Sequence, residues 1–178
     1  MNSLQSALYF VVSTLMGLYQ IVLLLRLLLQ LVRADFRNPI SRAVLQLTDP
    51  LVRPLRRLLP PIGKIDTGLV MALVLFTAAK VWILHALQFS GIPGPATLTM
   101  NTFWDLVEVL LKTYLFSIVL NAILSFVAPG NYSPAQSILA SICEPVLRPF
   151  RRIIPPVGGL DLSPLWACIV IQALLLII

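Results

Sequence analysis

Charged residues are scarce in this sequence. Of its 178 residues only 11% are Asp, Glu, Lys or Arg, whereas 58% are hydrophobic, and the mean hydropathy is +0.93. A soluble globule of this size needs more polar side chains to cover its surface. The composition therefore excludes an ordinary soluble domain and places the chain in a lipid bilayer.

The residue types that carry catalysis and metal binding are also few. His85 is the single histidine, and its place near the end of an apolar stretch is more typical of an interfacial side chain than of a metal or haem ligand. Cys143 and Cys168 have no paired spacing, so we expect no disulfide. No glycine-rich phosphate loop or nucleophile motif occurs. We therefore expect no catalytic residue, no metal, no cofactor and no enzymatic activity.

Four apolar stretches are long enough to cross a bilayer, which takes about 20 helical residues for roughly 30 Å of hydrocarbon. They lie at about residues 7–32, 67–87, 106–128 and 162–178. The first lacks the basic start of a secretory signal and is too long for one, so we expect it to be retained. The last is near the lower limit of length and should stand upright or sit in thinned bilayer. The sequence thus predicts an all-α membrane protein with four transmembrane helices.

Basic residues are confined to certain connecting segments. Seven lie between the first and second stretches and three between the third and fourth, whereas residues 88–104 and the first six residues contain none. Because short cytoplasmic loops retain Lys and Arg, we expect both basic loops to be cytoplasmic and both termini to lie outside. The net charge of +6 then indicates anionic lipid as the nearest partner, and no nucleic acid.

The sequence contains an internal repeat with a register of 95 residues. Residues 49–66 read DPLVRPLRRLLPPIGKID and residues 144–161 read EPVLRPFRRIIPPVGGLD, with nine of eighteen positions identical. The identical pairs are Pro50 and Pro145, Arg53 and Arg148, Pro54 and Pro149, Arg56 and Arg151, Arg57 and Arg152, Pro60 and Pro155, Pro61 and Pro156, Gly63 and Gly158, and Asp66 and Asp161. Each half, residues 1–95 and 96–178, contains two apolar stretches, so the duplication is parallel, with its pseudo-axis along the membrane normal.

Each basic loop has the pattern of amphipathic interfacial helices, at residues 39–59 and 134–154. The pairs Asn38-Pro39 and Ser133-Pro134 each resemble an N-cap followed by a first helical proline. The acidic residue before Pro50, and the one before Pro145, predict that the helix restarts there. Pro54 and Pro149 predict a kink.

Arginines occupy one side of the second part of each interfacial helix, opposite leucines such as Leu51, Leu55 and Leu58 in the first half. Such a helix lies in the headgroup plane with its apolar face down, and each arginine beside an anionic leaflet is worth on the order of 1 kcal/mol. The candidate residues for binding lipid or a partner are Arg53, Arg56, Arg57, Arg148, Arg151 and Arg152.

The remaining repeated residues have structural roles in this interpretation. The double prolines end the interfacial helix and the glycines permit a sharp turn. Asp66 and Asp161 then precede the second apolar stretch of each half. Two roles are open for each: capping the following helix, or pairing with an arginine of the same or the opposite half, and the two are compatible.

Charges inside the apolar stretches are costly and are therefore candidates for function. Arg26 is close enough to the cytoplasmic end to snorkel to the headgroups. Lys80 pairs with Asp105 or Glu108, snorkels outward, or lines a polar path; these alternatives stay open. Glu108 and Lys112 are four residues apart and are expected to form a local ion pair. The candidate polar path contains Lys80, Asp105, Glu108, Lys112, Asn121 and Arg26.

The twin phrases resemble the repeat of the YggT family, small bacterial inner-membrane proteins with relatives in photosynthetic organelles. The resemblance covers about residues 15–178 and implies a four-span protein of two repeats in the bacterial inner membrane. The chain departs from the pattern at Thr67 and Gly68, where the second half has Leu162, Ser163 and Pro164. The resemblance implies links to osmotic stress, ion homeostasis and cell division, and in plastids to cytochrome assembly and nucleoid organisation, none of which is a reaction.

Two function classes follow. The first is a membrane scaffold or assembly factor whose paired basic helices hold anionic lipid or a partner protein. The second is a small channel or transporter component that uses the intramembrane charges, as an oligomer because four helices make a narrow bundle.

Overall fold

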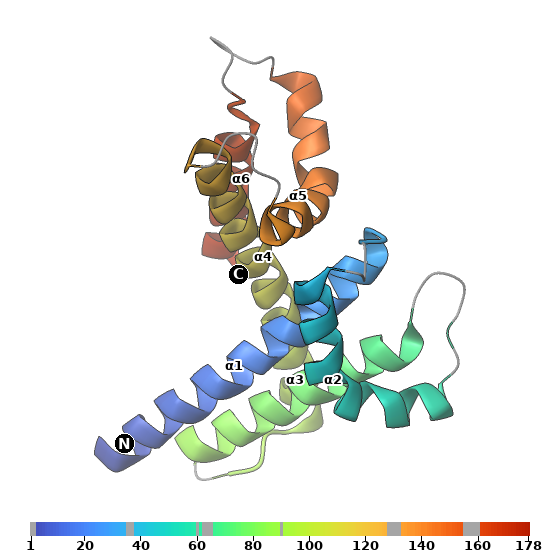
Figure 1. Ribbon diagram of the computed structural model, residues 1–178. Helices are drawn as coiled ribbons and strands as arrows, with labels where there is room; N and C mark the ends of the chain where they lie inside the picture. The colour runs from blue at the N-terminus through green and yellow to red at the C-terminus, as the bar shows by residue number, and fades with distance from the viewer. Residues whose placement is uncertain are drawn as a thin grey trace. The chain divides into compact units, whose positions relative to one another are not determined.

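The computed structural model consists of six α-helices (Figure 1), and it describes residues 3–34, 38–59, 61, 66–89, 91–127, 133–154 and 161–178. The helices are α1 (Ser3–Leu31), α2 (Pro39–Leu58), α3 (Thr67–Gln88), α4 (Pro95–Val127), α5 (Pro134–Ile153) and α6 (Ser163–Ile177). No strand occurs among these residues. The predicted all-α class is confirmed.

Three helices are long and apolar enough to cross a membrane: α1, α3 and residues Pro95–Ser125 of α4. The fourth apolar helix, α6, has 15 residues and is shorter than that criterion requires, so the fourth span stays a prediction. The helix α4 begins at Pro95, before the third apolar stretch predicted from about residue 106, and the bounds of that span stay a prediction. Polar residues such as Asn101 and Thr102 lower the hydropathy of its first turns without breaking the helix. The hydroxyl of Thr102 donates to the carbonyl of Leu98 at 2.7 Å.

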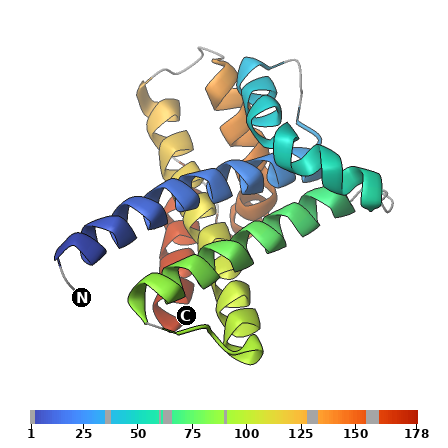
Figure 2. The ribbon, with the colours of Figure 1, turned by 90° about the horizontal axis from the view of Figure 1, so that it is seen from below.

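The interfacial segments form one helix each. Ser133 caps α5 as expected, its Oγ accepting from the backbone N–H of Gln136 at 3.1 Å. However, α2 continues through Asp49, Pro50 and Pro54, so the predicted restart at Asp49 was wrong. Figures 1 and 2 show α2 changing direction along its length, as expected where a proline removes a backbone donor and crowds the preceding turn.

The chain divides into two compact units that cut across the sequence repeats. One unit contains Met1–Leu27 and Val44–Val109, and the other contains Leu28–Ala43 and Leu110–Ile178. The second unit has a core of apolar residues from α4, α5 and α6, namely Ile118, Cys143, Leu147, Ala167 and Ile171. The repeat therefore describes the order of elements along the chain, whereas packing mixes elements from both halves.

Cys143 lies in this core, although it falls in a loop predicted to be cytoplasmic. Its side chain is fully buried. Burial raises the pKa of its thiol to about 12, with a smaller contribution from Cys168. Because the thiolate is the reactive form, Cys143 should react poorly with thiol reagents.

The start of α3 lies directly against α2 at Gly68. A Cβ atom added to Gly68 would lie 2.9 Å from the backbone N and Cα of Arg56. Real Cβ atoms do not approach backbone this closely, so glycine is required for this approach. The second repeat has Ser163 at the equivalent position and accommodates a side chain there.

We predict that Gly68→Ala destabilises the protein by about 1–3 kcal/mol, since the added methyl group must push the backbone of α2 away. Gly17→Ala in α1 is the matched control, because a Cβ there meets nothing within 4 Å. It should leave stability unchanged or raise it by up to about 1 kcal/mol, through helix propensity. Reversible unfolding in detergent measures both, and equal effects of the two substitutions would contradict the close approach.

Candidate functional site

The helix α2 has a face buried against the rest of the protein. Ser41, Val44, Thr48 and Val52 recur at spacings of three and four residues and are all buried. Of the leucines predicted to face lipid, Leu51 and Leu55 are only partly exposed, and Leu58 is largely exposed. The apolar face of α2 is therefore covered in large part by protein.

Arg56 holds α2 to the start of α3. Its Nε donates to Oδ2 of Asp66 at 2.6 Å, and its Nη2 contacts the same oxygen. Asp66 is 2% exposed, and its Oδ1 accepts from the backbone N–H of Leu69 at 3.2 Å, which caps α3. Both roles predicted for Asp66 are thus confirmed, with an arginine of the same half as the partner.

The second repeat makes the same contact between α5 and α6. Arg151 Nε donates to Oδ2 of Asp161 at 2.8 Å, and Asp161 Oδ1 accepts from the backbone N–H of Ser163 at 2.9 Å. Arg151 also bonds Glu144 at 2.7 Å. We call the two pairs, Arg56–Asp66 and Arg151–Asp161, the clamps. The second is exposed, so it should contribute less to stability than the first.

The second clamp depends on pH in a defined direction. Burial raises the pKa of Asp161. Hydrogen bonds from Ser163, together with the hydrogen bond and positive charge of Arg151, lower the pKa by more than burial raises it. The pKa of Asp161 therefore lies below its ordinary value. A depressed carboxyl pKa gives stability that is present above the unfolded pKa and lost as the pH falls through the folded pKa. The clamp is therefore intact at neutral pH.

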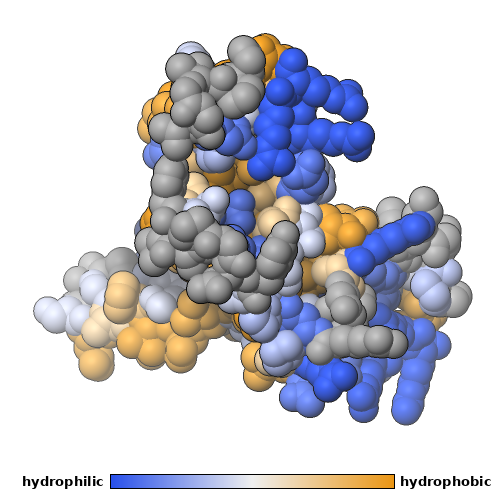
Figure 3. All heavy atoms as spheres, turned by 45° about the horizontal axis from the view of Figure 1, so that its top comes forward, coloured by the Kyte–Doolittle hydropathy of each residue, from blue (hydrophilic) through white to orange (hydrophobic). Residues whose placement is uncertain are grey.

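The other four arginines are not part of the clamps. Arg53 and Arg57 are four residues apart on α2, and Arg148 and Arg152 are four apart on α5; all are exposed. Arg53 pairs with Asp49 at 2.7 Å yet stays 74% exposed. The other three make no ion pair with any residue that the structure describes. Figure 3 shows hydrophilic side chains in two separate groups, one over α2 and one over α5, and we refer to these four arginines, two on each helix, collectively as the basic face.

Arg26 was predicted to snorkel, and this was wrong. Its side chain is 2% exposed, and its Nη1 donates to Asp49 Oδ1 at 2.9 Å and to Thr48 Oγ1 at 2.7 Å. These bonds tie α1 to α2. Burial raises the pKa of Asp49, but Arg26 and Arg53 outweigh it and hold the pKa below its ordinary value. The second repeat has Asn121 in place of Arg26 and cannot form this pair.

A buried polar network joins α1, α3 and α4. Lys80 Nζ donates to Asp105 Oδ1 and to Gln20 Oε1, both at 2.6 Å. Gln20 Nε2 donates to Asp105 Oδ2 at 2.7 Å and to Thr77 Oγ1 at 2.9 Å. The predicted pairing of Lys80 with Asp105 is confirmed. Gln20 was missed, although an amide in the middle of an apolar stretch is itself a signal for a buried polar contact.

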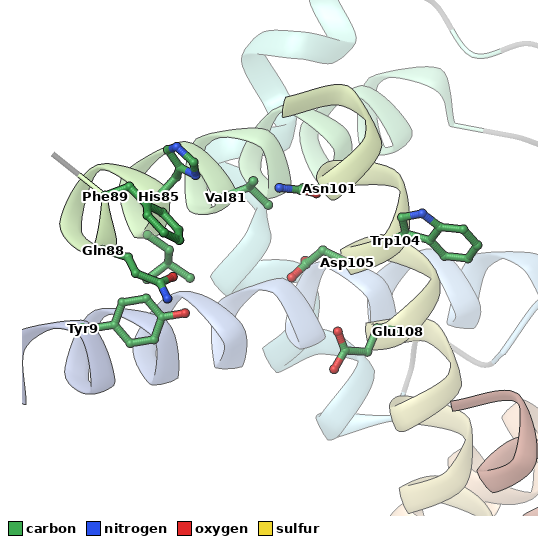
Figure 4. A pocket seen from close by; sticks show the side chains of 10 residues that line it. Tyr9, Val81, His85, Gln88, Phe89, Asn101, Trp104, Asp105 and Glu108 are labelled. Carbon is green, nitrogen blue, oxygen red and sulfur yellow. The ribbon is translucent and has the colours of Figure 1, made fainter. Parts of the chain in front are cut away.

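A pocket of about 290 Å³ adjoins this network. Figure 4 shows Asp105 and Glu108 projecting from α4 toward the space bounded by α1 and α3. The lining residues are Tyr9, Val81, Leu84, His85, Gln88, Phe89, Asn101, Trp104, Asp105 and Glu108. Two residues of the predicted polar path, Asp105 and Glu108, line this pocket. Arg26 pairs with Asp49, away from the pocket lining, and Lys112 and Asn121 are not among the described lining residues. No group of three or more His, Cys, Asp or Glu that could hold a metal ion occurs in the described part of the chain.

The two repeats differ in these features. The clamps occur in both halves, whereas the residues equivalent to Gln20, Lys80 and Asp105 are Leu115, Leu175 and Phe10. The polar network thus combines Gln20 and Lys80 of the first half with Asp105 of the second, and the equivalent positions carry no polar residues. Pro60, Gly63, Pro155, Pro156 and Gly158, predicted to shape the turns, lie outside the described residues; Pro61 is described and exposed.

Comparison with known proteins assigns a family. The family model for CCB3/YggT matches residues 5–87 and 100–178, one segment for each repeat. An uncharacterized protein of Pseudomonas aeruginosa is 38% identical over 175 residues, covering 97% of this chain and 88% of that protein. The Escherichia coli K12 protein YggT is 36% identical over 165 residues, covering 90% of this chain and 82% of its own. A shorter match is to the Arabidopsis thaliana protein called YlmG homolog protein 2, chloroplastic. The two sequences are 54% identical over 35 residues, which cover 20% of this chain and 14% of that protein. No solved structure matches.

We predict that Lys80→Leu destabilises the protein by about 3 kcal/mol, since it leaves the carboxylate of Asp105 and the amide oxygen of Gln20 without their shared donor. Adding Asp105→Leu should recover most of this loss, because no buried charge then remains. A double-mutant cycle measured by reversible unfolding gives the coupling between the two residues. Additive losses would show that the pair contributes nothing as a pair.

Proposed function

This chain belongs to the CCB3/YggT family, and we propose that it is a non-enzymatic membrane scaffold that gathers anionic lipid headgroups of one leaflet on its basic face. The observation that carries the proposal is the division among the six repeated arginines. All six are exposed, but Arg56 and Arg151 are held by the clamp aspartates. Arg53 pairs with Asp49 and stays 74% exposed. Arg57, Arg148 and Arg152 make no ion pair with a described residue and are available to a ligand.

The clamps give the basic face its direction. If the interfacial helix were free to move, binding a lipid through its arginines would first have to order the helix. The entropy lost in that ordering would offset much of the binding free energy. Each clamp ties its interfacial helix to the first turn of the helix that follows. The arginines of the basic face on that interfacial helix therefore keep a constant distance from the start of the following helix. Phosphate is a suitable ligand, because a guanidinium donates two parallel hydrogen bonds to it.

The proposed placement is the bacterial inner membrane, with α1, α3, α4 and α6 as the four spans. Both basic loops then face the cytoplasm and both termini face the periplasm. At about 1.5 Å per residue, α6 is about 22 Å long, less than the roughly 30 Å of hydrocarbon. The bilayer is therefore expected to be thinner beside α6, which brings headgroups toward Arg148 and Arg152.

Lipid selectivity tests the proposal. In a Trp82→Phe/Trp104→Phe background, Trp166 reports from the start of α6, where it is 48% exposed. Brominated phosphatidylglycerol should quench its fluorescence at several-fold lower mole fraction than brominated phosphatidylcholine. Arg148→Gln/Arg152→Gln should reduce this preference at least fivefold, because one arginine is worth about 1 kcal/mol, or about a factor of five.

Arg148→Lys/Arg152→Lys is the matched control, since it keeps both charges and should keep the preference. The proposal fails if the glutamine variant retains the full preference for the anionic lipid. It also fails if the wild-type protein shows no preference and the arginines instead crosslink to a partner protein in native membranes.

Topology is tested with cysteines at exposed, uncharged positions in a Cys143→Ala/Cys168→Ala background. Gln46→Cys on α2 and Ala140→Cys on α5 should react with a membrane-impermeant maleimide only in inverted vesicles. Ala96→Cys at the start of α4 should react only in intact spheroplasts. Labelling of Gln46→Cys and Ala140→Cys from opposite sides would overturn the parallel arrangement.

The polar network and its pocket favour ion conduction as a second candidate function. A buried Lys–Asp pair with an amide and a hydroxyl, in helices long enough to span, is the kind of group found on ion and proton paths. The variant Lys80→Leu/Asp105→Leu separates the candidates. It should leave lipid selectivity intact under the first function, whereas under the second it should abolish ion flux into proteoliposomes that hold the wild-type protein.

A further inference from the structure

An apolar groove lies between α4 and α6, at the end of α6 that carries the second clamp. Its volume is about 710 Å³, within the range of small-molecule sites. Ile118, Ala122 and Ile123 line it from α4, and Leu165 and Cys168 line it from α6. All of these residues belong to the same compact unit. The groove is thus a feature of one rigid part of the molecule.

The part of the equivalent surface that α1 contributes in the first repeat is covered. Val119 and Ile123 are 43% and 51% exposed, whereas their counterparts Leu24 and Leu28 are 4% and 3% exposed. No residue in the described part of the chain covers the second surface in this way. The duplication therefore left a similar apolar surface packed in one half and open in the other.

Side-chain size also differs between the two surfaces. Ala122 stands where the first repeat has Leu27, and Cys168 stands where it has Leu73. Both replacements remove bulk from the walls of the groove. The second repeat is accordingly open both because nothing packs over it and because its walls are lined by smaller side chains.

One end of the groove is polar. Asp161 lines it there, with its carboxylate satisfied by Arg151 and by the backbone N–H of Ser163. Arg151 bonds this carboxylate and that of Glu144, and the further positive charge on α5 comes from Arg148 and Arg152. Arg152 follows Arg151 directly, and Arg148 precedes it by three residues.

We propose that this groove holds one acyl chain of a single anionic phospholipid, whose phosphate meets the arginines of α5. The proposal rests on the lipid-binding function above and adds a defined site that binds one lipid molecule per chain. An acyl chain matches the apolar walls, and the phosphate matches the basic end, so one molecule satisfies both parts of the site. Bound there, the lipid covers the surface that protein covers in the first repeat.

A lipid fits this site better than a helix of a second copy does. A packed helix is about 10 Å wide and would lie across the polar end as well as the apolar walls. It would cover the polar end, where Arg151 already pairs with Asp161 and Glu144, without supplying an anion to Arg148 and Arg152, which is costly for charges removed from water. A flexible chain that ends in a phosphate has no such cost.

Native mass spectrometry of the full-length protein, released from bilayers of equal phosphatidylglycerol and phosphatidylethanolamine, tests the site. The wild-type protein should retain one phosphatidylglycerol per chain. Ala122→Leu/Cys168→Leu, which installs the residues of the first repeat, should lower the retained fraction about tenfold. Ala173→Leu is the matched control, because it adds the same three carbons on an exposed part of α6 outside the groove and should retain the lipid.

Equal retention by the filled variant and the wild-type protein would overturn the groove site. So would retained lipid without preference for the anionic headgroup, or a dimer mass without lipid, which would assign the groove to a second copy. These failures are distinct from failure of the proposed function. The filled variant keeps all four arginines of the basic face, so its quenching preference for phosphatidylglycerol at Trp166 reports on that function separately.

Discussion

The ion pair between an interfacial helix and the start of the following apolar helix is the contact on which the rest of the arrangement depends. Arg56–Asp66 and Arg151–Asp161 occupy equivalent positions in the two halves. Each aspartate also accepts a backbone N–H of the next helix. One carboxylate thus begins a helix and holds the preceding helix against it. In the first clamp the aspartate is buried and Gly68 allows a close approach of the two helices, whereas in the second both partners are exposed and Arg151 is shared with Glu144.

The two halves have diverged around this common contact. The first half has a buried arginine, Arg26, that joins Asp49, and it contributes Gln20 and Lys80 to a polar network. The second half has Asn121, Leu115 and Leu175 at the equivalent positions and carries an apolar groove instead. Duplicated elements with one shared anchor can diverge in this way, because each half keeps its clamp while its other surfaces change.

Two charges within the apolar helices are paired inside the protein. Arg26 and Lys80 each lie against a carboxylate, and Gln20 supplies further bonds to the second pair. Such pairs add little net stability, because desolvation offsets the attraction, but removing one partner is costly. They therefore select one packing of the helices over alternatives. The exposed charges are found mainly on α2 and α5, where lipid headgroups are proposed to lie.

The sequence by itself determined most of the helices and the repeat. Periodic apolar residues and flanking prolines located α2, α3 and α5 closely, whereas for Asp66 and Asp161 the sequence left capping and pairing with an arginine both open and did not name the arginine. Tertiary structure alone decided the partner of Arg26, the role of Gln20, the burial of Cys143 and the opening of the groove. The physical reason is that periodicity reports which face of a helix is apolar, whereas only the packed chain decides whether protein or lipid covers that face.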